Sequence, residues 1–355
     1  AKEAKPALLE AARSADEAVA VAAFKGLTIL ADGADAPAMV ELLAGLQTEA
    51  ARGYAENAVV AAAGRIADKT VQADAVLEKL NSEQPATVSA SLLRVAGRIA
   101  NAGAFQVVDS AAGSQDPTIR DIAIRALAAW PDGRALDRLA RIAKDSSNAT
   151  HRVLALRGYV RLLGSDKKLS AAQQVTKYEH AMSLARSDAD RKLVLAGLAN
   201  VSHPDALPIA MAYVDTPAVK DEAMLAALKI AQATAGARPA AARAAALKIA
   251  AEASRTQTRD QAKTLADTIG SAVSIFDGRT FDGWEGNMEI FRIEDGAIVG
   301  GTLDKRIVRN EFLCTEREYG DFELRLKVKL LGDAASANAG IQIRSRRIPD
   351  HHEMI

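Results

Sequence analysis

The feature that most constrains this fold is a short helical sequence that recurs through the first two-thirds of the chain. Ala-Gly-Arg-Ile occurs at 63–66 and again at 96–99. Related segments follow one another at spacings of about 29 to 39 residues, at 25–28, 125–128, 157–160, 196–199 and 226–229. A repeat of this length is typical of helical hairpins, each of which buries too little apolar surface alone and must stack on its neighbours.

The segment after residue 115 shows how one repeat can fold. Asp116 can cap a helix, and Pro117 suits the first helical turn. One face of the predicted helix collects four apolar side chains, Ile119, Ile122, Ala126 and Leu127. Pro-Asp-Gly at 131–133 turns the chain, and a return helix begins with Leu136, Leu139 and Ile142.

These repeats resemble HEAT repeats, which implies an α-solenoid over residues 1–233, followed by a terminal hairpin or linker over 234–270. Such a solenoid either binds a protein partner on its concave surface or acts as a spacer that presents the next domain. No basic stripe or aromatic row decides between the two. Three histidines are scattered singly, so we expect capping or surface roles for them and not metal binding: His151, His180 and His203.

A change of composition near residue 270 indicates a second domain. Residues 1–270 hold seven aromatic side chains, and the last 85 residues hold seven more. The first part is rich in the helix formers Ala and Leu, whereas the second is rich in Ile, Val and Phe with Asp-Gly pairs that suit hairpins. We therefore predict a multidomain chain, α and then β.

Three segments of the second part predict strands. Residues 322–330 alternate strictly between apolar and charged side chains, and residues 339–345 place Gln342 and Arg344 on one face. Residues 289–300 predict a hairpin that turns at Asp295 and Gly296. Short strands of this kind indicate an antiparallel β-sandwich or jelly roll. We expect Cys314 to be a small buried residue on one of its strands.

The overall charge and hydropathy exclude several classes of function. The net charge is zero, so no electrostatic argument favours a nucleic acid or an anionic membrane as partner. No apolar run approaches the roughly 20 residues of a membrane span, and no signal peptide is visible. The single cysteine excludes an intrachain disulfide framework. The sequence lacks an initiator Met, so we interpret it as a mature form or a fragment.

The second part resembles the 3-keto-disaccharide hydrolase family. Four segments carry the likeness in order and spacing, at 274–284, 291–302, 312–326 and 338–353. The resemblance implies a concanavalin-like jelly roll over residues 271–355. The helical part is similar to the repeats that accompany such domains in environmental bacteria.

The family resemblance also implies a substrate class and a reaction. Members act on sugars already oxidised at carbon 3, as 3-keto-glycoside 1,2-lyases or as hydratases of the resulting 2-hydroxy-3-keto-glucal. The ketone acidifies the hydrogen at C2, so a base can remove it and the C1 substituent can leave with help from an acid. Water then adds back, and the net result is hydrolysis. This route differs from the two-carboxylate mechanism of ordinary glycosidases.

The polar residues near the C-terminus are the candidates for this chemistry. Catalytic candidates are His351, His352 and Glu353 as base or acid, and Arg344 as the group that holds the enolate. Substrate-binding candidates are Gln342, Arg346 and Asn338, whereas Arg347 ranks lower because a continuing strand would direct it to the opposite side. No cofactor is indicated with certainty. A divalent metal, Ca²⁺ or Zn²⁺, is an open option for the histidines and Glu353.

The same residues leave other interpretations open. Exposed adjacent histidines are often only solvated, and Arg344 beside Arg346 suits a surface salt bridge. The region could also be a carbohydrate-binding module without turnover, or the solenoid could carry the main role as a protein-interaction scaffold. The family pattern continues past Glu353, so we expect a truncated, incomplete sandwich whose 322–330 strand exposes apolar surface, and a chain that is inactive alone. Family habit predicts a periplasmic or extracellular location.

Overall fold

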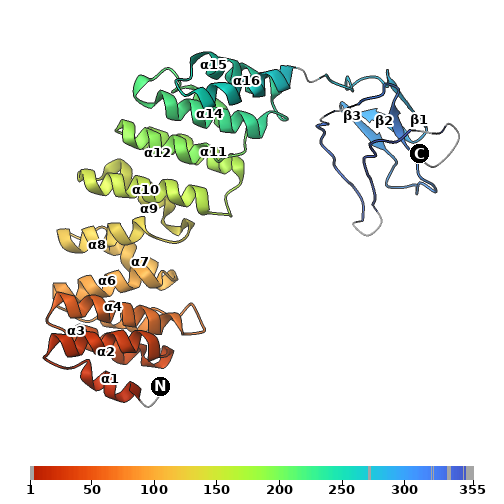
Figure 1. Cartoon of the computed structure of the whole chain (residues 1–355). Coiled ribbons are helices and arrows are strands. Elements are labelled where there is room, and N and C mark those ends of the chain that lie inside the picture. Colours follow the sequence, from red (N-terminus) through yellow and green to blue (C-terminus); the bar gives the residue numbers. More distant parts are fainter. Residues whose placement is uncertain are drawn as a thin grey trace.

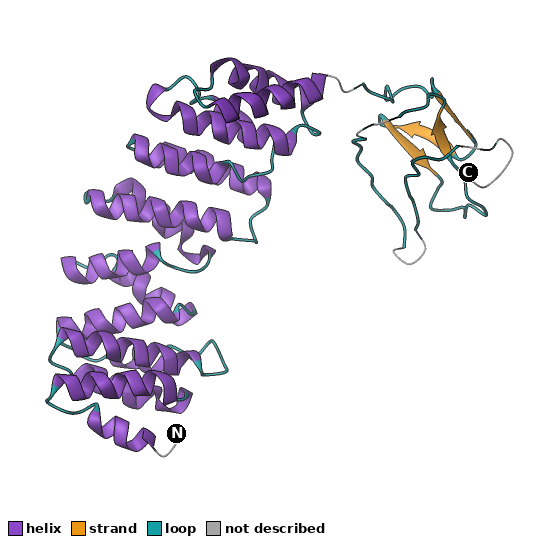
Figure 2. Ribbon diagram, in the orientation of Figure 1, coloured by secondary structure: helices purple, strands orange, loops and turns teal. Residues whose placement is uncertain are grey.

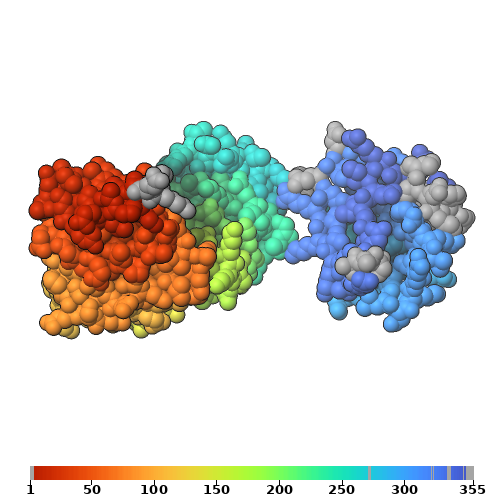
Figure 3. Space-filling model, turned by 90° about the horizontal axis from the view of Figure 1, so that it is seen from below, coloured from red at the N-terminus to blue at the C-terminus, as the bar shows by residue number. Residues whose placement is uncertain are grey.

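The computed structural model describes residues 4–270, 273–320, 322, 324–333, 337–346 and 348. Within this part of the chain, helices α1 to α16 come first and four short strands follow (Figures 1 and 2). In the space-filling view the helical part and the β region stand apart as two masses (Figure 3). None of the helices in the described residues has the length and apolarity of a membrane span.

Helices occupy most of the first 270 residues. Their bounds are α1 (Lys5–Ala11), α2 (Glu17–Leu30), α3 (Ala36–Gly45), α4 (Glu49–Gly64), α5 (Asp74–Leu80), α6 (Ala86–Ile99), α7 (Ala102–Ala111), α8 (Pro117–Ala128), α9 (Leu136–Asp145), α10 (Ala149–Ser165), α11 (Ala171–Leu184), α12 (Asp188–Leu198), α13 (Ala206–Met211), α14 (Lys220–Thr234), α15 (Pro239–Glu252) and α16 (Thr256–Gly270). Short 3₁₀ turns precede α3, α9 and α14, at Gly33–Asp35, Gly133–Ala135 and Pro217–Val219.

The helices pack as successive pairs in a row. Each odd-numbered helix contacts the even-numbered helix that follows it, from α1 with α2 to α15 with α16. The even-numbered helices contact one another in order from α2 to α16, and Figure 1 shows the resulting stack. The recurring sequence segments lie on, or at the end of, the even-numbered helices, so the sequence repeat marks the helices that connect one pair to the next.

The predicted repeat at 116–142 is confirmed in its details. The Asp116 carboxylate accepts hydrogen bonds from the backbone N–H groups of Thr118 and Ile119, and Pro117 begins α8. Leu127 is buried, and the other three apolar residues of that face pack against the core. Leu136, Leu139 and Ile142 of α9 are buried as well.

A recurring arginine, which the sequence analysis missed, ties the two helices of a pair together. The fourth residue of four even-numbered helices is an arginine whose guanidinium donates to the carbonyl six positions earlier. This carbonyl lies at or just past the C-terminus of the preceding helix, where backbone acceptors have no helical partner. The pairs are Arg52 with Leu46, Arg120 with Ser114, Arg152 with Ser146, and Arg259 with Ala253.

A second set of polar contacts links one pair to the next. Arg161 of α10 donates to the carbonyls of Ala128 and Trp130 at 3.1 and 2.6 Å, which satisfies acceptors at the end of α8. His151 is buried, and its Nε2 lies 3.1 Å from Oδ1 of Asp121 on α8. The expectation of a surface or capping role for His151 is therefore wrong: the imidazole bridges two helices. The pKa of Asp121 is lowered, because Arg125 donates to its carboxylate and His151 adds a second contact.

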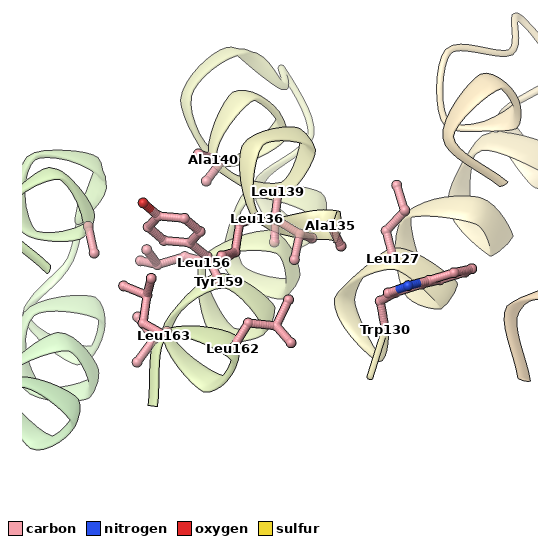
Figure 4. Packing of buried hydrophobic residues seen from close by; sticks show 14 of the residues in the cluster. Leu127, Trp130, Ala135, Leu136, Leu139, Ala140, Leu156, Tyr159, Leu162 and Leu163 are labelled. Atoms are coloured by element: carbon pink, nitrogen blue, oxygen red, sulfur yellow. The ribbon is translucent and has the colours of Figure 1, made fainter. Parts of the chain in front are cut away.

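The hydrophobic core runs along the helical stack, and large side chains fill the space between the helices. Trp130 and Tyr159 are fully buried among leucines of α8, α9 and α10 (Figure 4). The ring of Phe105 meets that of Trp130 edge to face, with centroids 5.3 Å apart. Burial raises the pKa of Tyr159 and of Tyr178 to about 12. These aromatic side chains fill space between helices and are not available for acid–base chemistry near neutral pH.

The β region contains two small antiparallel sheets in the described residues. β2 (Phe291–Glu294) pairs with β3 (Ala297–Gly300), and β1 (Trp284–Gly286) pairs with β4 (Leu313–Thr315). The predicted hairpin is confirmed, with Asp295 and Gly296 between the strands at φ angles of 47° and 76°. Two consecutive positive φ angles match the right-handed twist of the strands, which explains the Asp-Gly pair. Cys314 lies on β4 and is half-buried, not fully buried.

Two predicted strands are not formed. Residues 322, 324–330 and 339–345 carry no strand in the described part of the chain, although their sequences alternate as expected. Alternation expresses a local preference, whereas a strand forms only when a neighbouring segment completes its hydrogen bonds. The apolar side chains of 322–330 are between 39 % and 64 % exposed. The β-sandwich thus stays a prediction, as does the division of the chain at residues 233 and 270.

We predict that Gly158→Ala destabilises the helical stack. A Cβ atom at this position of α10 would lie 2.7 Å from the carbonyl oxygen and 2.8 Å from the Cα of Ala128 on α8. Because the obstacle is backbone, the helices must separate, which costs about 1–3 kcal/mol. Thermal unfolding followed by helical circular dichroism measures the change.

Gly53→Ala on α4 is the matched control for this substitution. Apart from its chain neighbours and the backbone of its own helix, no atom of the described residues lies within 4 Å of a Cβ placed there. Alanine should therefore stabilise the helix by about 0.5–1 kcal/mol through its higher helix propensity. Equal midpoints for the two variants would show that close approach of α8 and α10 does not limit stability.

Candidate functional site

The described candidate residues lie together on one exposed segment of the chain. Asn338, Gln342, Arg344 and Arg346 are all exposed between residues 337 and 346. Arg344 has a φ angle of 56°, which is uncommon for a residue with a side chain. Such a residue interrupts an extended backbone, so the predicted strand face that joins Gln342 to Arg344 is not formed. The segment holds a local contact in which the Ser345 hydroxyl donates to the Ile343 carbonyl at 3.1 Å.

The remaining catalytic candidates cannot be related to this segment. His351, His352 and Glu353 lie outside the described residues, as does Arg347. The structure therefore describes Arg344 and its neighbours, but not the proposed base and acid. Their roles remain predictions from the sequence.

An ordered turn at the start of the β region is organised by hydrogen bonds to one carboxylate. The Asp277 carboxylate accepts from the backbone N–H groups of Arg279 and Thr280 at 2.7 and 2.8 Å, and from the Thr280 hydroxyl at 2.9 Å. These donors lower the pKa of Asp277, the backbone N–H of Thr280 most. The Trp284 indole donates to the Ile275 carbonyl at 2.7 Å and closes the turn. This segment carries part of the family likeness. Its polar side chains hold the backbone turn in place.

A second feature that sequence reasoning missed is the role of Arg292. Its guanidinium donates to Glu294 on the same strand and to the Gly301 carbonyl beyond β3, each at 2.5 Å. The Gly301 contact ties the two strands together at the open end of the hairpin. Residues two apart on a strand share a face, so the Arg-x-Glu spacing was the available signal.

Metal binding is not supported by the described residues. Among them no group of three or more His, Cys, Asp or Glu side chains is arranged to hold an ion. His180 is exposed and its ring lies 6.2 Å from that of Tyr159, while the His203 Nδ1 accepts from the Asp205 backbone N–H. The predicted surface or capping roles fit these two histidines.

Two grooves are formed between helices in the stack. One, of about 370 Å³, is mostly apolar and lies between α13 and α15, where Leu207, Met211 and Ala245 line it. The other, of about 360 Å³, lies between α8 and α10 and is lined by three arginines, Arg125, Arg157 and Arg161.

The chain thus combines a long stack of helices with a small antiparallel β region. Residues 271–354 match the family described as the 3-keto-alpha-glucoside-1,2-lyase-like domain. The C-terminal region is accordingly a domain of this family, as its sequence motifs predicted. The family is associated with lyase and hydrolase activity on carbohydrates.

Other comparisons add little. No curated protein matches the chain. Among solved structures, human deoxyhypusine hydroxylase in complex with glycerol is 14% identical over 76% of this chain and 97% of that one, with a TM-score of 0.31. A structure titled for the computational design of self-assembling cyclic protein homooligomers is 17% identical over 76% and 89%, with a TM-score of 0.14. TM-scores this low support no conclusion about fold or function.

We predict that Asp277→Ala releases the Trp284 indole from its hydrogen bond, because the carboxylate organises the turn that carries the acceptor. A ¹⁵N correlation spectrum should show a shifted Trp284 indole signal. The signal of Trp130, which is buried in the helical stack, should not move. Movement of both signals, or of neither, contradicts a local role for Asp277.

The same turn should also depend on pH. The folded-state pKa of Asp277 is lowered, so its contribution to stability is present above the usual carboxyl range. It is lost as pH falls through the depressed value. The Trp284 indole signal should therefore hold steady from neutral pH down past the usual Asp range and change only below it. A change centred at an ordinary Asp pKa would show that the turn does not hold the carboxylate.

Proposed function

We propose that the C-terminal domain cleaves 3-keto-glycosides by removing the proton at C2 and eliminating the C1 substituent, with or without later hydration. The supporting observation is the family match over residues 271–354, which spans the motifs that first suggested it. The described structure adds the ordered turn at Asp277 and the Arg292-locked hairpin, two of those motifs in folded form.

The chemistry requires three groups around the sugar. A base takes the C2 proton, and the electrons of the C–H bond form an enolate with the C3 ketone. The C1–O bond then breaks, and an acid protonates the departing oxygen, which leaves a 2-hydroxy-3-keto-glucal. When water adds, hydroxyl bonds to C1 and a proton returns to C2. Positive charge near the enolate oxygen lowers the barrier most.

We assign these roles to the polar residues near the C-terminus. Glu353 is the proposed base, and His351 or His352 the proposed acid, since either type can be tuned toward neutral pKa. The exposed guanidinium of Arg344 is the proposed enolate partner, because it carries a permanent charge and a planar set of donors. Gln342, Arg346 and Asn338 are proposed to bind sugar hydroxyls.

The helical part is proposed to be a HEAT-like solenoid that serves as a scaffold for this domain. Two features support this: the recurrence of the packed pair and the repeated arginine at the fourth position of the even-numbered helices. The jelly roll and a periplasmic or extracellular location remain part of the same proposal and rest on the family resemblance. A divalent metal, Ca²⁺ or Zn²⁺, stays an open option that rests on the side chains of His351, His352 and Glu353.

We predict that the full-length protein, given a 3-keto-glucoside in D₂O, releases the aglycone and removes the original C2 hydrogen, and that any hydrated product carries deuterium at C2. Glu353→Gln should lower the rate about 10²–10⁴-fold by removing the base. Arg344→Ala should lower it about 10²–10³-fold by removing charge from the enolate. Mass spectrometry and NMR of the products measure both events.

The control is Lys305→Ala, which removes an exposed cation elsewhere in the β region and should leave the rate unchanged. Saturable binding without release would replace the enzyme with a carbohydrate-binding module. Release with the original C2 hydrogen retained in the sugar product would exclude base-initiated elimination. Equal losses for Lys305→Ala and Arg344→Ala would show that the arginine has no specific role.

A further inference from the structure

The groove between α8 and α10 brings three arginines together around apolar side chains. Arg125 of α8 and Arg157 and Arg161 of α10 line it, with Leu154 and Ala128 among the apolar groups. Its volume of about 360 Å³ is enough for one or two side chains and not for a folded ligand. The floor of the groove is small and apolar, and long cationic side chains surround it. Such a groove can bind an anionic group that is attached to an extended chain.

The positive charge in this groove is only partly neutralised. Arg125 donates to the Asp121 carboxylate at 2.7 Å, so that pair is close to neutral. Arg161 donates to backbone carbonyls, which are uncharged, and it keeps its full charge. Arg157 is exposed and has no ion-pair or hydrogen-bond partner in the part of the chain that the structure describes. Two uncompensated guanidinium groups therefore share one groove.

We propose that this groove binds an acidic peptide segment of a partner protein, with a Glu or Asp carboxylate held by Arg157 and Arg161. Guanidinium groups bind carboxylates through two parallel hydrogen bonds, which gives both affinity and direction. The half-buried Leu154 offers an apolar contact for the stem of the same side chain.

A peptide fits these observations better than a nucleic acid. Binding along a nucleic acid needs a stripe of cations that neutralises many phosphates. Here the chain as a whole has no net charge, and the three arginines are confined to one groove. Arg161 also caps α8, so the site is built on two packed helices and is held in place before any partner arrives.

The test is a fluorescence anisotropy titration of the full chain with a fluorescein-labelled hexaglutamate peptide at low salt. We expect saturable binding that Arg157→Glu weakens by about tenfold or more, since the substitution reverses one of two uncompensated charges. Arg157 makes no hydrogen bond or ion pair in the described residues, so thermal unfolding of the variant should match the parent chain.

The matched control is Arg141→Glu on α9, which changes the net charge equally at an exposed position outside the groove. It should leave peptide affinity within about twofold of the parent chain. Equal weakening by both variants would overturn the proposal, because it would indicate diffuse attraction only. Tighter, Arg157-dependent binding of a labelled single-stranded oligonucleotide of equal charge would overturn it in favour of a nucleic acid.

Discussion

Close contact between successive even-numbered helices is the constraint on which the helical part depends. Gly97 of α6 faces the Ala126 side chain of α8, and Gly158 of α10 lies against the Ala128 backbone. Small residues at these points let the helices approach, and the buried leucines and aromatic side chains then fill the space between pairs. A helical pair alone would expose that apolar face, so stability belongs to the stack and not to any single repeat.

The β region is stabilised by interactions of a different kind. Its order comes from local hydrogen bonds at Asp277, Trp284 and Arg292, together with two short strand pairs. The family match covers the β region, so we propose that the carbohydrate chemistry lies there and that the helical stack supplies a frame for it. The arginine groove between α8 and α10 gives the frame a binding role of its own, separate from the chemistry.

Much of this fold could be predicted from sequence, because the signals were local. The Asp116 cap, the face of α8 and the Asp295–Gly296 turn each depend on residues within one or two turns of chain. The predictions that failed depend on contacts between residues that are far apart in the sequence. Nothing near His151 in sequence indicates its contact with Asp121. The alternation over 322–330 predicts a strand, but the described residues of that segment pair with no other strand. The site was predicted only by resemblance, since its base and acid candidates lie outside the described residues.

Cooperative stacking stabilises the helices, whereas the alternating segment at 324–330 forms no strand among the described residues. Hydrogen–deuterium exchange of the intact chain, read by mass spectrometry of its peptides, tests this most directly. We predict that α8 and α10 exchange slowly and with a common protection, because they open together. Residues 324–330 should exchange faster than either helix, because they form no strand among the described residues. Independent exchange of α8 and α10, or protection of 324–330 as strong as theirs, would contradict the account.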